Sequence, residues 1–277
     1  MNKTTIYNKN FYYFDADDPV IEILKNGQLF GLDNYLLLKS FTADLSGWVI
    51  DCGAHIGTFG FVPVLEKHKV LLIEGAKQNY ECLKATFFEF FDNAIIENAI
   101  VLDKKQNCNF PSNYGPFGSP EIKENGEEES TTIDEICLKH NIEKVSMIKI
   151  DIEGFEEEAL SGAGNIINKN KPVMLLEVNV HCLRLRDKKP RDILQKIEQM
   201  NYISFIINNS TLIPVDKDKK FPFCNTDIIC IHRHNIHQYI GYTQFSDYLS
   251  DDNIKKISEE NYLSSNEACR KYFESIE

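Results

Sequence analysis

Short apolar runs alternate with stretches of helical periodicity along most of the chain. The runs have the length of buried strands, and the segments between them repeat apolar residues every three or four positions. Strands are predicted at residues 48–50, 70–73, 94–99, 145–151, 173–178, 202–207 and 227–231, the last two paired across residues 208–210. The longest predicted helices are 78–91 and 190–200. This alternation favours a parallel sheet with helices on both faces.

The pattern is less regular at both ends of the chain and in one long internal segment. Residues 1–46 are aromatic-rich and predict an N-terminal cap that is partly strand and partly helix. Residues 47–235 predict the main domain, and residues 236–277 predict a peripheral helical tail. Between residues 101 and 130, many Asn, Pro, Gly and Ser residues predict loops around short antiparallel strands. A loop of this length is often functional.

The first two core strands each end on an acidic residue. Asp51 is followed by a turn that contains Gly53 and Gly57, and Glu74 ends the next strand. Glycine permits unusual backbone dihedral angles and lets a ligand lie directly on the backbone. The helix N-terminus behind the turn offers free N–H groups. Because the carboxyl ends of parallel strands meet at one edge of a sheet, this pattern predicts one small-molecule site.

Composition and charge narrow the range of partners. The 277 residues are 43% hydrophobic, which allows a substantial core, and the formal net charge is −12. This charge opposes a nucleic-acid partner, because phosphates attract clustered Lys and Arg. The first residues lack the apolar core of a signal peptide, and no run approaches the ~20 apolar residues of a membrane span. We therefore expect a cytoplasmic protein without a membrane span.

Cysteine and histidine positions do not predict a metal centre. The eight cysteines are scattered without a Cys-x-x-Cys pair, which favours buried free thiols over disulfides or zinc ligands. His232, His234 and His237 are close in sequence, but no acidic or thiol ligand accompanies them in the segment. No metal-binding residue is predicted, and the need for a divalent metal is left open.

Five short motifs in order resemble those of the FkbM-type S-adenosylmethionine-dependent methyltransferases. They are Asp51-Cys52-Gly53-Ala54-His55-Ile56-Gly57, Glu74-Gly75-Ala76-Lys77-Gln78-Asn79, Asn98-Ala99, Thr132-Ile133-Asp134, and Ile148-Lys149-Ile150-Asp151-Ile152-Glu153-Gly154-Phe155-Glu156. Gly75 replaces the proline that is usual in this family, but the acid before it is kept. The resemblance covers about residues 47–179. It implies a Rossmann-like class I methyltransferase fold (α/β), with a mostly parallel seven-stranded sheet and helices on both faces.

The resemblance also implies S-adenosylmethionine as the cofactor. Asp51 and the turn at residues 53–57 would border its methionyl part, and Glu74 would accept hydrogen bonds from the ribose hydroxyls. The predicted cofactor-binding residues are Asp51, Gly53, Ala54, His55, Gly57, Glu74, Asn79, Asn98, Ala99 and Asp151.

Three residues are candidates for catalysis. Methyl transfer needs the acceptor oxygen held in line with the methyl group and a route for the hydroxyl proton. Asp151 and Glu153 either bind the acceptor and remove its proton, or cap the helix that starts near residue 155. The ordinary pKa of His181 would suit a base, although a lone histidine is more often structural. Lys149 is either exposed at a sheet face or paired with a buried acid.

We predict an O-methyltransferase that acts on a hydroxyl of a sugar or glycan. The loop at residues 109–120 either stacks Tyr114 and Phe117 on a sugar ring or is a disordered connection. The basic run at residues 184–191 either grips an anionic group of the acceptor or is a solvated loop. One alternative is a nicotinamide-dependent oxidoreductase, which the missing Gly-x-Gly-x-x-Gly spacing disfavours. Another is a non-catalytic glycan- or partner-binding module, which the intact cofactor motif disfavours.

Overall fold

The structure is a computed structural model of the whole chain. It describes all residues except 43, 111–117, 209–210, 219–220, 222–223 and 237–277. The chain divides into two compact units, Met1–Met174 and Leu175–Glu277, and each is described by itself. The predicted boundaries after residues 46 and 235 stay predictions, and nearly all of the predicted tail lies outside the described residues.

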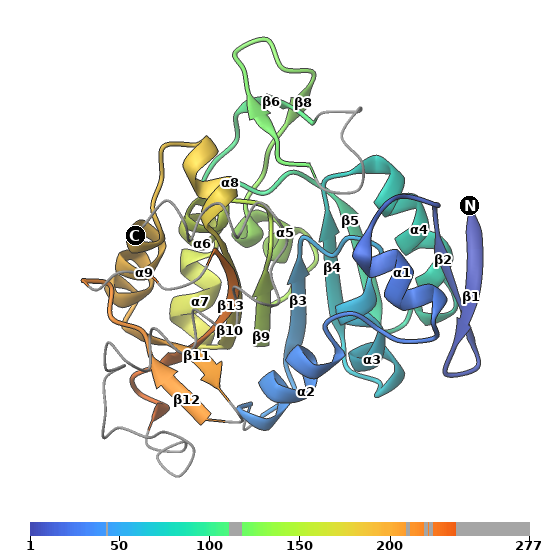
Figure 1. The fold of residues 1–277 in the computed structure, drawn as a ribbon, viewed down its shortest axis with the longest axis horizontal. Coiled ribbons are helices and arrows are strands. Elements are labelled where there is room, and N and C mark those ends of the chain that lie inside the picture. Colours follow the sequence, from blue (N-terminus) through green and yellow to red (C-terminus); the bar gives the residue numbers. More distant parts are fainter. Residues whose placement is uncertain (43, 111–117, 209–210, 219–220, 222–223, 237–277) are drawn as a thin grey trace. The chain divides into compact units, whose positions relative to one another are not determined.

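Four parallel strands form the centre of the first unit. They are β3 (Trp48–Cys52), β4 (Val70–Glu74), β5 (Ala94–Asn98) and β9 (Val145–Ile150). Their order is β9-β3-β4-β5, and each neighbouring pair is parallel (Figure 1). β4 is buried along its whole length, which explains why its sequence is continuously apolar instead of alternating. These four strands confirm the predicted ones to within two residues at each end.

Helices connect the parallel strands, as the periodicity predicts. They are α3 (Thr58–Leu65), α4 (Lys77–Phe87), the 3₁₀-helix η1 (Phe88–Phe90), α5 (Ile133–Lys139), α6 (Glu156–Gly162) and α7 (Gly164–Asn170). Thr132 caps α5, because its hydroxyl accepts a hydrogen bond of 3.0 Å from the Glu135 N–H. The prediction of one helix to residue 91 is wrong. The chain tightens into η1 after Phe87, which leaves Phe88 and Phe91 exposed.

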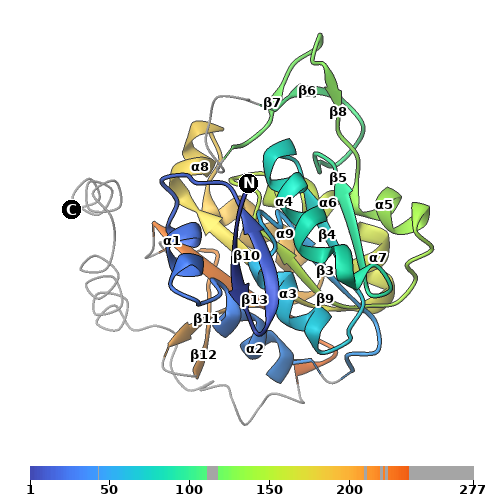
Figure 2. The same cartoon turned by 90° about the vertical axis from the view of Figure 1, so that its right-hand side faces the viewer.

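The N-terminal segment is an integral part of the first unit. It contains a hairpin of β1 (Asn2–Ile6) and β2 (Lys9–Tyr13), followed by α1 (Pro19–Lys25) and α2 (Leu32–Ser40) (Figure 2). This confirms the expected mixture of strand and helix. The buried ring of Phe11 lies 5.1 Å from that of Phe61 in α3, and the Tyr12 N–H donates to the Thr86 hydroxyl of α4 at 3.0 Å.

A small antiparallel sheet follows β5 in the chain. β6 (Asn107–Asn109) pairs with both β7 (Glu121–Ile122) and β8 (Glu128–Glu129). This confirms the prediction of loops around short antiparallel strands. Cys108 of β6 contributes to a buried cluster with Ile100, Leu102 and Phe155.

The second unit has strands of mixed direction. Its elements are β10 (Val173–Asn179), α8 (Val180–Leu185), α9 (Pro190–Gln199), β11 (Tyr202–Asn208), β12 (Thr211–Pro214) and β13 (Asn225–His232). The strand order is β12-β11-β13-β10. β11 pairs antiparallel with β13, as predicted, and also with β12.

Two features of the second unit differ from the prediction. The next strand along the chain after β11 is β12, and β13 follows it. β12 was missed because it is short and ends on a proline, which usually argues against a strand. The predicted count of seven strands is therefore not confirmed. α8 was also missed, because its six residues show too little periodicity to predict a helix.

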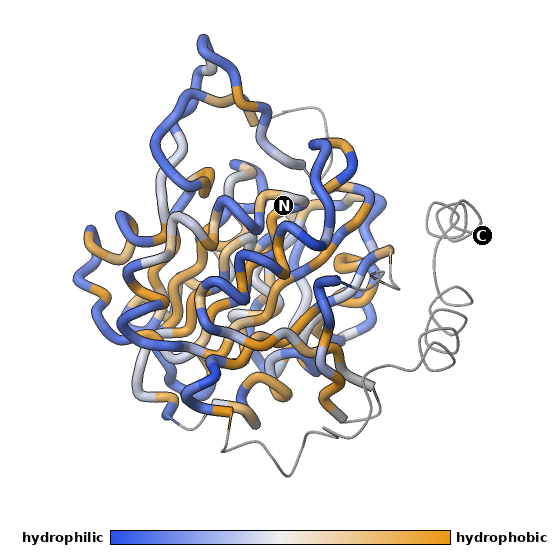
Figure 3. The backbone as a smooth tube through the Cα atoms, turned by 90° about the vertical axis from the view of Figure 1, so that its left-hand side faces the viewer, coloured by the Kyte–Doolittle hydropathy of each residue, from blue (hydrophilic) through white to orange (hydrophobic). Residues whose placement is uncertain are grey.

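The interior of both units is apolar. Figure 3 shows this as orange strands bordered by blue turns. Among the described residues, no helix is long and apolar enough to cross a membrane. Six cysteines are free thiols, as expected. Cys224 is disulfide-bonded, so the expectation of free thiols is wrong there. Pairing depends on the separation of the two Cβ atoms in the folded chain, which sequence spacing does not reveal.

Candidate active site

The turn after β3 is shaped by left-handed residues and by close packing. Gly53, His55 and Gly57 have φ angles of 79°, 52° and 94°. A Cβ on Gly53 would lie 1.7 Å from the Asp151 carbonyl oxygen, and one on Gly57 would lie 2.5 Å from the Phe87 ring. The glycines are thus required by contacts within the protein. The expected unusual backbone angles are confirmed at Gly53 and Gly57, and the expectation that a ligand lies on this turn stays a prediction.

Glu74 joins this turn to the end of β4. Its Oε2 accepts a hydrogen bond of 2.7 Å from the His55 N–H, and its Oε1 accepts one of 2.8 Å from the Ala76 N–H. Asn79 also donates to this carboxylate. Burial raises the pKa of Glu74, and these donors oppose the shift. A carboxylate offers about four acceptor positions, so these three donors leave room for a ligand hydroxyl.

Asn98 and Ala99 hold the backbone that follows Glu74. The Asn98 side-chain amide donates to the carbonyls of Glu74 and Gly75 at 2.8 and 3.0 Å. The Ala99 N–H donates to the same Glu74 carbonyl at 3.1 Å. These groups therefore shape the loop that carries Glu74. The structure places both residues beside the acid, at the end of β5.

Lys149 carries the positive charge of the site. Its ammonium lies 3.5 Å from Asp51 Oδ1 and 3.1 Å from Asp151 Oδ2. It also donates a hydrogen bond of 3.2 Å to the Gly53 carbonyl. Of the two predictions for Lys149, pairing with a buried acid is confirmed, since Asp51 is fully buried.

The surroundings of Asp51 favour its neutral form more than water does. Burial raises its pKa to about 6, the Lys149 ammonium opposes this shift, and the Asp151 charge adds to it. Hydrogen bonds from Lys149 and from the Gly60 N–H also favour the charged form. The charge of Asp51 is therefore compensated mainly by Lys149.

The end of β9 forms a second tight turn. Glu153 and Gly154 have φ angles of 54° and 94°. The buried Glu156 holds this turn, because its Oε1 accepts hydrogen bonds from the Ile152 and Gly154 N–H groups at 3.1 and 3.0 Å. Sequence analysis missed this role, although Glu156 lies within the quoted motif. Burial raises the pKa of Glu156 to about 7.

Asp151 and Glu153 are both partly exposed at this turn. Helix α6 begins at Glu156, and its N-cap residue is Phe155. Asp151 and Glu153 therefore lie outside the N-cap position, which argues against the simple capping alternative. Asp151 is instead anchored by Lys149 beside the turn after β3.

His55 links the site to the N-terminal segment. Its Nε2 lies 3.1 Å from Oδ2 of Asp18, whose side chain is fully buried. The other oxygen of Asp18 accepts a 2.7 Å hydrogen bond from the Val20 N–H and so caps α1. The Asp18-Pro19 pair is a helix-start signal that could have been read from the sequence. Nothing in the sequence pointed to the contact with His55.

The other predicted residues belong to the second unit or lie outside the described residues. His181 belongs to the second unit, where it is exposed on the first turn of α8. In the basic run, Arg191 pairs with Asp218 at 3.0 Å, as expected of a solvated surface. Tyr114 and Phe117 lie outside the described residues.

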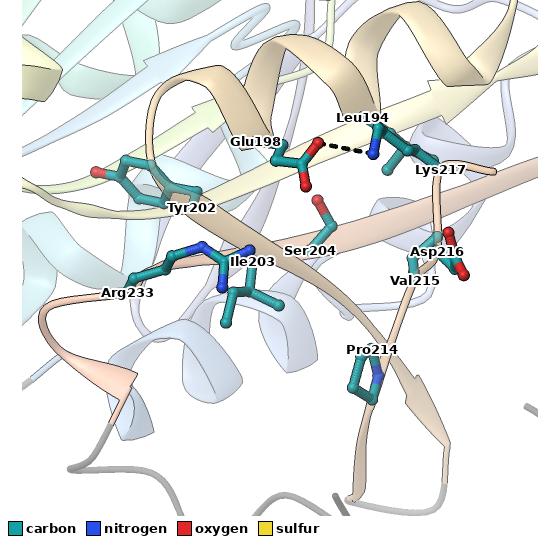
Figure 4. Close-up of a pocket in the computed structure, with 10 residues that line it drawn as sticks. All are labelled: Leu194, Glu198, Tyr202, Ile203, Ser204, Pro214, Val215, Asp216, Lys217 and Arg233. Atoms are coloured by element: carbon teal, nitrogen blue, oxygen red, sulfur yellow. Dashed lines mark ion pairs between the residues drawn. The ribbon is translucent and has the colours of Figure 1, made fainter. Parts of the chain in front are cut away.

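The second unit also contains a pocket of about 320 Å³ between α9, β11 and the segment after β12 (Figure 4). An ion pair of 2.9 Å joins Glu198 and Lys217 in its lining. None of the predicted site residues lines it. Its lining residues are Leu194, Glu198, Tyr202, Ile203, Ser204, Pro214, Val215, Asp216, Lys217 and Arg233.

Together, the parallel strands and the acids at their carboxyl ends define an α/β protein with a Rossmann-like ligand site. Residues 51–204, more than half of the chain, match the methyltransferase FkbM domain. The chain belongs to this family of methyltransferases, which confirms the resemblance drawn from its motifs. No curated protein matches the sequence.

Several solved methyltransferase structures are similar to the chain. The FkbM methyltransferase of Methylobacillus flagellatus KT is 16% identical, with 78% of this chain and 61% of that chain covered and a TM-score of 0.41. A SAM-dependent O-methyltransferase of Thermotoga maritima is 10% identical, with coverages of 78% and 71% and a TM-score of 0.41. A precorrin-6y C5,15-methyltransferase of Geobacter metallireducens GS-15 is 11% identical, with coverages of 72% and 85% and a TM-score of 0.40.

The pairing of Lys149 with Asp51 predicts a large loss of stability when the lysine is removed. Lys149→Met should lower the free energy of unfolding by about 3–5 kcal/mol, because it leaves a buried carboxylate unpaired. The loss should be smaller at pH 5 than at pH 8, since Asp51 can then take up a proton. Urea denaturation measures both. Lys169→Met, which removes an exposed pair with Glu143, should cost only about 0–1 kcal/mol. Equal losses in the two variants would contradict this account.

Glu156 predicts a pH dependence of stability. Its pKa is near 7 in the folded protein, above its ordinary 4.5, so the folded state holds a proton that the unfolded chain releases. Stability should therefore fall as the pH rises from 4.5 to 7, by about 1.4 kcal/mol for each unit of pKa difference. Glu156→Gln keeps an acceptor oxygen and should flatten this dependence.

Denaturation at several pH values tests the slope. The exposed Glu129→Gln serves as the control and should leave the slope as it is in the unsubstituted protein. A Glu156→Gln variant with the original slope would mean that Glu156 does not hold the extra proton.

Proposed function

We propose that the protein transfers the methyl group of S-adenosylmethionine to a hydroxyl oxygen of a sugar or glycan. The observation that carries this proposal is the 2.7 Å hydrogen bond between the Glu74 carboxylate and the His55 N–H. It unites the turn after β3 with the acid after β4 in a single site. Membership of a methyltransferase family gives that site its chemistry.

The residues of the first unit fit such a cofactor. Glu74 is a buried acceptor with spare capacity for ribose hydroxyls. The turn at residues 53–57 and the Asp51–Lys149 pair lie beside it, where the charged methionyl part would bind. When bound, the cofactor supplies an activated methyl group on its sulfonium. No role is assigned to a metal.

The acceptor is proposed to bind near the end of β9. Asp151 and Glu153 are partly exposed there, so they can contact an acceptor hydroxyl. A sugar hydroxyl is a weak nucleophile, and a carboxylate in reach would accept its proton as the methyl is transferred. His181 is kept as a third candidate base. The net charge of −12 supports a small or glycan acceptor instead of a nucleic acid.

The cofactor proposal predicts a site that binds S-adenosyl compounds and does not bind NAD. Calorimetry should show binding of S-adenosylmethionine and S-adenosylhomocysteine, and no binding of NAD. Glu74→Ala should weaken binding by about 10- to 150-fold, because it removes hydrogen bonds to a charged group worth about 1.5–3 kcal/mol. Gly53→Val is not a usable test, since its Cβ would collide with Asp151.

Two variants serve as controls for the calorimetry. Glu74→Gln keeps an acceptor for the His55 N–H. It therefore separates the effect of removing the charge from the effect of disrupting the loop conformation. Glu89→Ala removes an exposed acid in η1 and should change nothing. Preferential binding of NAD would favour the oxidoreductase alternative. Binding of neither cofactor would favour the non-catalytic module.

The acceptor proposal predicts methyl incorporation into carbohydrate. Labelled cofactor should be offered with saccharides, catechols, peptides and RNA, and the product located by mass spectrometry. Asp151→Asn and Glu153→Gln remove a charge at constant size. If one of these acids is the general base, its variant should turn over ~10²–10⁴-fold more slowly. Cofactor affinity should change much less. His181→Asn is tested in parallel.

Two results would overturn this assignment. Methyl groups found only on a nitrogen, a catechol or a nucleotide would exclude a sugar hydroxyl. Normal turnover in both acid variants would mean that Asp151 and Glu153 serve only the structure of the turn.

A further inference from the structure

An aromatic ring fills the space beside Gly75, the residue that follows Glu74. A Cβ built on Gly75 would lie 2.8 and 3.2 Å from two carbons of the Phe110 ring. The ring therefore occupies the position that a side chain at residue 75 would take. Gly75 does not have a left-handed φ angle, so its backbone conformation would accept other residues. A side chain at residue 75 would therefore need the Phe110 ring to shift, whereas the backbone of the turn would accept it.

The Phe110 ring is held in place by the small sheet of β6 and β8. The Phe110 N–H donates a 2.8 Å hydrogen bond to Glu128 Oε2. The neighbouring Asn109 Oδ1 accepts one of 2.9 Å from the Glu127 N–H. The ring packs against the buried cluster of Ile100, Leu102, Cys108 and Phe155. Because Phe110 is only partly buried, part of its surface remains available to a ligand.

The position of Glu74 determines which part of a nucleoside comes near this ring. In a nucleoside, the base is attached to the carbon next to the 2′ position. We take Glu74 to accept hydrogen bonds from the ribose hydroxyls. The base must then lie close to Glu74 and to the residues around it. Asn98 points its amide donors at the Glu74 and Gly75 carbonyls, and Phe110 offers a flat apolar surface beside Gly75, the residue after the acid.

We propose that the Phe110 ring packs against the adenine of the bound cofactor, in the space that a side chain at position 75 would otherwise fill. This inference rests on the proposed function. Phe110 is thus an affinity residue that comes from the insertion after β5 and not from the strand-end motifs. Because every base has an aromatic face, this contact supplies affinity but does not distinguish adenine from other bases.

Removal of the Phe110 ring should weaken the binding of ligands that carry adenine and leave the binding of other ligands unchanged. Calorimetry with Phe110→Ala should give a Kd for S-adenosylhomocysteine that is about 5- to 150-fold higher, the range expected for aromatic–base stacking. The Kd for S-ribosylhomocysteine, which lacks adenine, should not change. Phe110→Tyr keeps the ring and should bind both as the unsubstituted protein does. Phe88→Ala removes an exposed phenylalanine and is the matched control.

Substitution of Gly75 provides an independent test. Gly75→Ala places a Cβ against the ring, so it should weaken S-adenosylhomocysteine binding several-fold when Phe110 is present. In the Phe110→Ala background the space is open, and the same change should cause no further loss. Additive effects of the two substitutions would overturn the inference, because they would mean that the residues act separately.

The outcomes also separate this inference from the proposed function. If the unsubstituted protein does not bind S-adenosylhomocysteine, the proposed function fails. If it binds and Phe110→Ala has the same Kd, only the adenine contact is wrong. An equal loss for both ligands would show that Phe110 acts through the Glu74 loop, and would overturn the contact with adenine. Thermal unfolding of each variant checks that the fold is intact.

Discussion

The Lys149 ammonium is the interaction on which the geometry of the site depends. It lies between a fully buried carboxylate, Asp51, and a partly exposed one, Asp151, and it binds the Gly53 carbonyl. A buried charge is costly unless it is paired. β3 and β9 are parallel neighbours, so their carboxyl ends deliver both acids to the same place. One cation therefore fixes the first turn relative to the second.

The two turns around this cation are built by the same device. In each, a buried glutamate accepts hydrogen bonds from two backbone N–H groups, and a non-glycine residue adopts a left-handed conformation. Glu74 does this for His55 and Ala76, and Glu156 does it on either side of Glu153. Left-handed residues are unfavourable on their own, so the buried acids stabilise the turns. Hydrogen bonds within the protein therefore support the shape of both turns.

Parts of the chain outside the strand-end motifs complete this site. The N-terminal segment reaches the turn after β3 through Asp18 and His55, and the insertion after β5 brings Phe110 against Gly75. The glycine at position 75, which differs from the usual proline of the family, is thereby explained. The Phe110 ring from the insertion occupies the place that a side chain at residue 75 would take.

The sequence by itself determined the parallel strands, the acids at their ends and the family, because these depend on local patterns of apolar residues and on short motifs. β3, β4, β5 and β9 were all predicted this way. The contacts of the glycines, the partners of Lys149 and the hydrogen bonds of Glu156 became known only from the folded chain. These contacts join residues up to about a hundred positions apart, such as Gly53 and Lys149. No local pattern encodes such a contact, because it arises only when packing brings the strand ends together.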